Sequence, residues 1–335
     1  MLLVLVGHTP PSLWTSHVIY SFHIPFFFAL SGFLHNPARH VRFVDLLQAR
    51  WRTLVLPYLA YSVIGYFGVV GQEFLLHHVW SLNPTRPIVA ALLGLRNSSI
   101  YHGTLWFVVC LLMTEFIYFA LYHLVRRNAF LVFLLSLPLA AYSFHPLVKV
   151  PFFPWSLDAA LVAIVFFSFG QLVRGLRTDR PQEWFSPPTL AIAGLVWLGG
   201  LFLEGKVDMY SDTYETPVYF LVTALAGIVL VFRLVPLLRP VRWIGYVGRH
   251  SLVYLALHQW LAFNIANRIL NPLRSLPFLQ GSLGFGILAL LTTCIALLLL
   301  WPVCEAFDRW APFLVGGGSK RPASPSVPCP EGGAG

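Results

Sequence analysis

Two histidines near the amino terminus stand in apolar stretches that have the composition of membrane spans. His8 ends the apolar run Met1 to Gly7, and His23 lies at the start of a second run that closes with Ser31-Gly32. An imidazole takes up and returns a proton near neutral pH, so both residues suit general acid–base catalysis. Ionisable side chains inside a span are costly and mark functional sites. The alternative for each is a structural histidine that is hydrogen-bonded between helices.

Two arginines mark a possible anion site further along the chain. Arg50 and Arg52 lie in the stretch Gln48 to Tyr58, at the expected start of a span. Guanidinium groups suit phosphate. On a helix, residues two apart point in different directions, so the pair would approach an anion separately rather than as one fork. Anchoring of the helix end at the membrane surface is the alternative.

Two polar and aromatic clusters interrupt later apolar segments. His102 and Trp106 open one span, and Trp155 with Asp158 opens another. These side chains are candidates for binding a substrate, and Asp158 is a candidate for orienting an imidazole or a hydroxyl. The alternatives are an interfacial aromatic belt and an acidic residue favoured at a helix amino terminus. We find no residue spacing typical of a metal site and no nucleotide-binding glycine motif.

The composition identifies the class of protein that must position these residues. The chain has 335 residues, of which 57% are hydrophobic and only 10% charged, with a mean hydropathy of +0.72. A soluble domain carries about 25% charged residues. We therefore predict an all-α, polytopic transmembrane bundle.

The apolar segments predict about ten helices. We expect the first of them to be truncated, since only seven residues precede His8 and a span needs about 20. Residues 1–310 should form one integral-membrane domain, and the Gly/Pro/Ser-rich residues 311–335 a disordered cytoplasmic tail. The expected segments are 1–8, 18–34, 53–71, 104–125, 129–144, 156–174, 188–204, 217–235, 250–267 and 283–304.

The basic residues predict an orientation. If the loop after the second helix is cytoplasmic and the sides alternate, sixteen of the 22 Lys and Arg residues fall inside. This asymmetry is what the positive-inside rule predicts. It places both termini in the cytoplasm, and it explains the net charge of +9 without a nucleic-acid partner. The six residues expected outside are Arg86, Arg96, Lys149, Lys206, Arg268 and Arg274.

These motifs together resemble a known family. The chain is similar to the acyltransferase 3 family of integral-membrane O-acyltransferases, and within it to the branch resembling fucose 4-O-acetylases. The similarity covers about residues 1–310. It rests on Gly7-His8, the stretch Ser21-Phe-His-Ile-Pro-Phe-Phe-Phe-Ala-Leu-Ser-Gly32, Arg50-Trp-Arg52 before Leu56-Pro57-Tyr58, Leu105-Trp106-Phe107, Trp155-Ser-Leu-Asp158, and Ile244 to Ser251 followed by His258.

The resemblance implies an enzyme of the inner (plasma) membrane that transfers an acyl group, most often acetyl, from cytoplasmic acyl-CoA. The acceptor would be a hydroxyl of a cell-surface carbohydrate, either a polysaccharide or a lipid-linked sugar. His8 would be the essential histidine and general base, with His23 or Asp158 orienting it. Arg50 and Arg52 would hold the CoA phosphates. Acetyl-CoA would be a co-substrate, and no permanently bound cofactor or metal is expected.

The sequence also departs from the family pattern. The family carries an arginine upstream of the histidine on the first helix, and this chain starts after that point. Two other readings therefore stay open: an inactive truncated family member, and a carrier for a lipid-linked sugar or small solute, because buried His and Asp also mark transport pathways. A carrier often shows inverted repeats, which we do not find.

Overall fold

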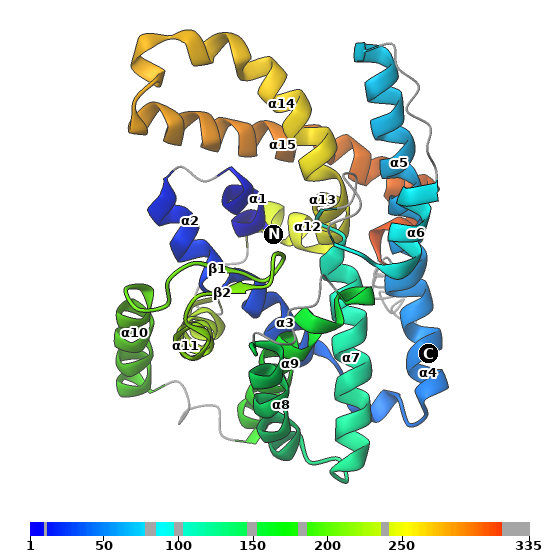
Figure 1. Cartoon of the computed structure of the whole chain (residues 1–335), viewed down its shortest axis with the longest axis vertical. Helices are drawn as coiled ribbons and strands as arrows, with labels where there is room; N and C mark the ends of the chain where they lie inside the picture. The colour runs from blue at the N-terminus through cyan, green and yellow to red at the C-terminus, as the bar shows by residue number, and fades with distance from the viewer. Residues whose placement is uncertain are drawn as a thin grey trace, which may run out of the picture.

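The computed structural model describes residues 1–9, 12–77, 85–96, 103–145, 153–179, 186–235 and 241–316, and within these ranges the chain is almost entirely helical (Figure 1). The first half contains α1 (Leu2–His8), α2 (Leu13–Tyr20), α3 (His23–Leu34), α4 (Phe43–Arg50), the π-helix η2 (Trp51–Val55), α5 (Leu56–His77), α6 (Thr85–Leu93), α7 (Trp106–Leu124) and α8 (Ala129–Ser143). Short 3-10 turns are η1 (Pro37–Arg39) and η4 (Pro154–Ser156).

The second half continues with longer helices and one small hairpin. Strands β1 (Val207–Asp208) and β2 (Thr213–Tyr214) pair antiparallel, with Val207 opposite Tyr214. The helices are α9 (Leu157–Asp179), α10 (Pro187–Leu201), α11 (Pro217–Leu234), α12 (Arg242–Arg249), α13 (Ser251–Leu257), the π-helix η6 (His258–Ala262), α14 (Phe263–Leu270) and α15 (Ser282–Trp310), with 3-10 turns η7 (Asn271–Ser275), η8 (Pro277–Leu279) and η9 (Pro312–Val315).

The all-helical class is confirmed, whereas a bundle of ten spanning helices is not. In the described part of the chain, five helical stretches are long and apolar enough to cross a membrane. They are Leu13–Leu34, Trp106–Leu124, Pro154–Leu176, Pro217–Leu234 and Ser282–Trp310. Two shorter apolar helices, α8 and α10, accompany them. Large apolar side chains such as Leu13, Phe202 and Leu283 are exposed, as expected of surfaces that face lipid.

Helix α9 is the centre of the bundle. Buried residues make up 78% of its most apolar stretch, against 33–44% in the other four candidate spans. Figure 1 shows α7, α8 and α9 side by side, with α10 and α11 beyond them and the hairpin of α14 and α15 above. Helix α3 runs between α9 and the helices around the amino terminus, so its two ends belong to different parts of the molecule.

Glycines allow α3 and α9 to touch backbone to backbone. A Cβ at Gly32 would lie 2.0 Å from the carbonyl oxygen of Phe167, and a Cβ at Gly170 would lie 1.9 Å from that of Ala29. Small residues permit such close helix packing inside membranes. The Ser31-Gly32 pair that closes the second apolar run therefore has a packing role, since Gly32 fixes how α3 sits on α9.

The ordered chain extends past the predicted domain boundary at residue 310. Turn η9 packs against α5, and its Leu314 and Val315 are buried. The Tyr61 hydroxyl donates a hydrogen bond to the carbonyl oxygen of Leu314 at 2.9 Å. Residues 311–316 are therefore ordered, and the boundary between the membrane domain and the tail stays a prediction. The rest of that tail, 317–335, lies outside the described residues.

Candidate functional site

Three histidines come together where α1, α3 and η6 meet. The ring centroids of His8 and His258 are 5.0 Å apart. His8 also lies close enough to His23 to interact with it electrostatically. His23 is 3% exposed and His258 is fully buried, whereas the His8 side chain is exposed. The cluster therefore holds one imidazole that a ligand can reach beside two that are enclosed.

The surroundings of His8 fix its position. Gly7 packs on Ile19 of α2, where a Cβ would meet the Ile19 side chain at 3.3 Å. The Thr9 hydroxyl lies 3.2 Å from that of Thr293 on α15. The end of α1 that carries His8 is thus held between α2 and α15.

Hydrogen bonds define the ring orientation of His23. Its Nδ1 lies 2.7 Å from the carbonyl oxygen of Ile19. A carbonyl only accepts, so Nδ1 must carry the proton and Nε2 the lone pair. The Tyr20 ring packs edge-on against this imidazole with centroids 4.9 Å apart. His23 is therefore held as the tautomer whose Nε2 can act as a base or acceptor.

The β1–β2 hairpin brings a carboxylate to this cluster. The hairpin packs against α2, and Asp208 interacts electrostatically with His8 and Tyr20. The two carboxylate oxygens of Asp208 already accept hydrogen bonds within the turn, from the Tyr210 amide at 2.9 Å and the Ser211 hydroxyl at 2.7 Å. No hydrogen bond joins Asp208 to His8 in the described part of the chain, so Asp208 contributes negative charge near His8.

Asp158 lies in a buried ion pair, not against His8. Its carboxylate receives the guanidinium of Arg96, which is 3% exposed. Arg96 also donates to the carbonyl oxygen of Met209 at 2.9 Å, and its guanidinium lies 5.9 Å from the centroid of the Trp106 ring. The Tyr210 hydroxyl donates to the Arg96 carbonyl oxygen at 2.7 Å. Arg96 thus joins α7, α9 and the hairpin.

Trp155 lies at the edge of this Arg96 cluster. Its backbone is in the left-handed region, with φ 56°, and its side chain is about half exposed. The indole N–H donates to the carbonyl oxygen of Leu92 on α6 at 3.0 Å. Trp106 therefore contacts Arg96 and Trp155 contacts the end of α6, whereas His102 lies outside the described residues.

The opposite end of α3 carries a second buried cluster, built around Arg50. Its guanidinium pairs with Glu115 of α7, whose side chain is only 4% exposed. Another nitrogen of Arg50 lies 3.3 Å from Nδ1 of His35, just beyond the end of α3. Burial, reinforced by the charge of Arg50, lowers the pKa of His35 to about 3, so this imidazole is neutral. Gln171 and Arg174 of α9 donate to the His35 carbonyl oxygen at 2.7 and 2.5 Å.

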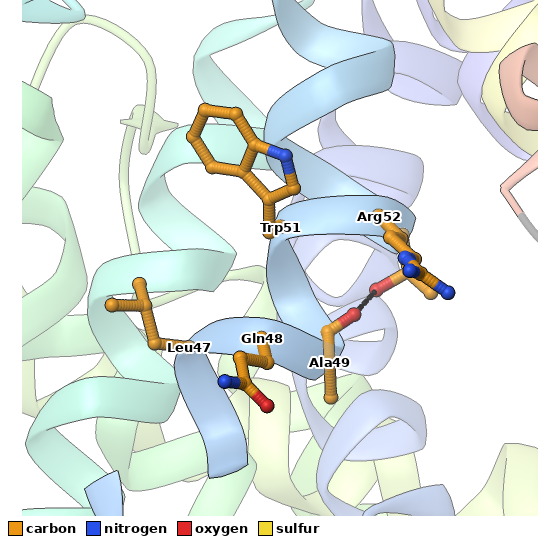
Figure 2. A pocket seen from close by; sticks show the side chains of 6 residues that line it. Leu47, Gln48, Ala49, Trp51 and Arg52 are labelled. Carbon is orange, nitrogen blue, oxygen red and sulfur yellow. Dashed lines mark hydrogen bonds between the residues drawn. The ribbon is translucent and has the colours of Figure 1, made fainter. Parts of the chain in front are cut away.

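Arg52 has a different environment from Arg50. The π-helix η2 turns Arg52 outward, where it lines an open pocket of about 970 Å³ with Leu47, Gln48, Ala49, Trp51 and Thr53. In Figure 2, Arg52 and Trp51 project from opposite sides of the helix. The Thr53 hydroxyl is tied back to the carbonyl oxygen of Ala49 at 3.0 Å. Arg52 therefore presents an exposed cation.

The length of α3 gives the distance between the histidine cluster and the Arg50 cluster. His23 opens α3 and His35 follows its last residue, twelve positions later. At 1.5 Å per residue the two ends are about 18 Å apart. The imidazole cluster thus lies at the start of α3, and the cluster around Arg50 lies just beyond its end.

The structure brings His8 and His23 together. Arg50 and Arg52 lie in the consecutive helices α4 and η2, but Arg50 pairs with Glu115 while Arg52 lines the pocket. The structure places Asp158 with Trp106 in the separate Arg96 cluster. The roles of all these residues stay predictions. Sequence reasoning missed Glu115, Asp208 and the burial of Arg96. The rule that flagged the histidines would have found Glu115, an acidic residue inside the apolar helix α7.

Helices of this length and composition define an integral membrane protein, in which α1, α3 and η6 carry a histidine cluster. A family model described as an acyltransferase domain, that of acyltransferase family 3, matches residues 1–301. The chain therefore belongs to this family of membrane acyltransferases. No curated protein and no solved structure matches it. The fucose 4-O-acetylase-like branch stays a prediction.

Proposed function

We propose that this acyltransferase moves an acyl group, acetyl in the simplest case, from acyl-CoA to a hydroxyl of a carbohydrate, with His8 as general base. The observation that carries the proposal is the state of His8. It is the exposed member of an otherwise buried histidine cluster, in a chain that matches an acyltransferase family. An imidazole that a substrate can reach and that neighbouring elements hold in place is what general base catalysis needs.

The donor would bind at the other end of α3. Arg52 supplies an exposed guanidinium for the CoA phosphates, and the pocket that it lines has room for a nucleotide. Arg50 is the second candidate, although Glu115 already engages it. The pantetheine arm of CoA is an extended chain, so it can carry the thioester from this end toward His8.

The chemistry then needs one base and no metal ion. His8 takes the proton of the acceptor hydroxyl as its oxygen attacks the thioester carbonyl carbon. The carbon–sulfur bond breaks, and the CoA thiolate takes the proton back from the His8 imidazolium. An acyl-histidine intermediate is the second route to the same products. Positioning by His23 and the field of Asp208 support a charged imidazolium in either route.

The carbohydrate acceptor would approach His8 from the side of the Arg96 cluster. Trp106 packs against Tyr210 of the hairpin whose Asp208 interacts with His8, and Trp155 offers a second aromatic face at the end of α6. We place this side outside an inner (plasma) membrane and both termini in the cytoplasm, on the charge distribution of the loops. A polysaccharide or lipid-linked sugar would then meet the donor at His8.

The test is transfer of radiolabelled acetyl from acetyl-CoA to the glycans of the source cell, in membranes that express the chain. Wild type should label glycan, His8→Ala should lose about 10²–10⁴-fold of the rate, and the matched control His123→Ala should retain it. His123 lies in the last turn of α7, away from the cluster. Equal labelling by wild type and His8→Ala would refute His8 as the base. A carrier would give no label and would not bind acetyl-CoA.

A further inference from the structure

His258 carries an unused lone pair inside the histidine cluster. It is the first residue of the π-helix η6. Helices of this kind are rare in proteins, and those that occur are often found at functional sites. The His258 side chain is fully buried, with the Phe263 ring packed edge-on at 5.2 Å. The neighbouring ring on another side is that of His8, 5.0 Å away with a 43° tilt.

The hydrogen bonds of His258 fix its tautomer. Nδ1 lies 2.7 Å from the carbonyl oxygen of Tyr254 and 3.0 Å from that of Leu255. Carbonyl oxygens only accept, so Nδ1 carries the proton and donates it. Nε2 is then an acceptor, and within the described chain it has no hydrogen-bond partner. A buried polar atom without a hydrogen-bond partner is destabilising, so this lone pair needs an explanation.

The geometry points to His8 as the donor. We propose that His258 is a positioning residue, whose Nε2 accepts the N–H of His8 and leaves the other ring nitrogen of His8 unprotonated toward the acceptor hydroxyl. Two imidazoles that share an N–H···N hydrogen bond of about 3 Å have ring centroids roughly 5 Å apart, which matches the observed separation. Helices α2 and α15 hold the backbone of His8, and its exposed side chain can still rotate into this geometry.

The two acidic candidates for this role make their hydrogen bonds elsewhere. Asp158, the predicted partner of an imidazole, is engaged by Arg96. Both carboxylate oxygens of Asp208 accept hydrogen bonds inside the hairpin turn. His23 also keeps an acceptor at Nε2, but His258 is the histidine whose ring contacts that of His8 and whose buried Nε2 has no partner among the described residues. Its catalytic consequence depends on the proposed function, but the hydrogen bond to His8 does not.

Two isosteric substitutions separate the acceptor from the donor of His258. In His258→Gln the side-chain amide reaches the position of Nε2, and its oxygen can accept from His8. In His258→Asn the amide occupies the position of Nδ1, so it keeps a donor for the Tyr254 carbonyl but loses the acceptor. We expect His258→Asn to lose about 10²–10³-fold of the transfer rate and His258→Gln to recover most of it, with acyl-CoA affinity and melting temperature unchanged in both.

The hydrogen bond itself is read by ¹⁵N NMR of the histidine-labelled chain in detergent, with His8→Ala to assign the His8 signals. Wild type and His258→Gln should show one His8 tautomer, and His258→Asn a mixture of two. Equal His8 tautomer populations in wild type and His258→Asn would overturn the inference, and so would full transfer by His258→Asn. If wild type transfers nothing, the proposed function fails while the NMR result still decides the hydrogen bond.

Discussion

The buried pair of Arg50 and Glu115 gives a quantitative prediction about stability. Replacing Glu115 by Leu leaves the Arg50 charge without its carboxylate, beside an imidazole that is neutral and cannot compensate it. Removing one partner of a buried ion pair costs about 3–5 kcal/mol. The Glu115 side chain is 4% exposed but that of Arg50 is 21% exposed, so some water reaches the arginine. We therefore expect a loss near the lower limit, about 3 kcal/mol.

Denaturant unfolding of the purified chain in detergent measures this loss, and a double variant tests its cause. Arg50→Met together with Glu115→Leu removes both charges, so it should recover most of the stability that Glu115→Leu loses. Asp45→Asn is the surface control, because its partner Arg42 is 78% exposed, and it should lower stability far less. The reasoning is refuted if the double variant is as unstable as Glu115→Leu, or if Asp45→Asn costs as much.

Three other predictions test the remaining parts of the account. Arg52→Ala should raise the Kd for acyl-CoA about 10- to 100-fold, the value of a charged hydrogen bond, without changing the unfolding midpoint; an unchanged Kd in a binding titration would contradict it. Gly170→Ala should destabilise by at least about 1–3 kcal/mol, because the new methyl group would meet the Ala29 backbone; wild-type unfolding would show that α3 and α9 can separate freely. Burial raises the pKa of Glu204 to about 7, so folding binds a proton there and stability falls as pH rises from about 4.5 to 7. Glu204→Gln should therefore stabilise the chain at pH 8, by no more than about 3 kcal/mol, and have little effect at pH 4.5. Equal effects at both pH values would refute the raised pKa of Glu204.

Much of the fold could be predicted from the sequence because the apolar runs that span a membrane are local signals. His8, His23 and Arg52 were also found locally, as polar residues inside or beside such runs. Gly32 could be noticed but not explained, since its reason is the carbonyl oxygen of Phe167 on α9. Contacts of this kind join positions more than a hundred residues apart.

Other features of the site depend on tertiary contacts that leave no local trace. The charge pattern places Arg96 on an outside loop, yet Arg96 is buried, with Asp158 and the β1–β2 hairpin as its partners. Arg52 points outward from the π-helix η2, and the sequence of this segment does not predict a π-helix. Glu115 was missed although the rule for charges in spans applies to it. The pairing of His258 with His8 needs the packing of η6 against the start of the chain.

The central claim is that His8 performs the transfer while the far end of α3 binds the donor. The most direct measurement compares acyl-CoA affinity and the rate of acyl transfer for purified wild type, His8→Ala and Arg52→Ala. We predict that His8→Ala keeps the wild-type Kd and loses about 10²–10⁴-fold of the rate, whereas Arg52→Ala has a higher Kd for acyl-CoA and transfers at the wild-type rate when the donor is saturating. Transfer by His8→Ala at the wild-type rate would contradict it.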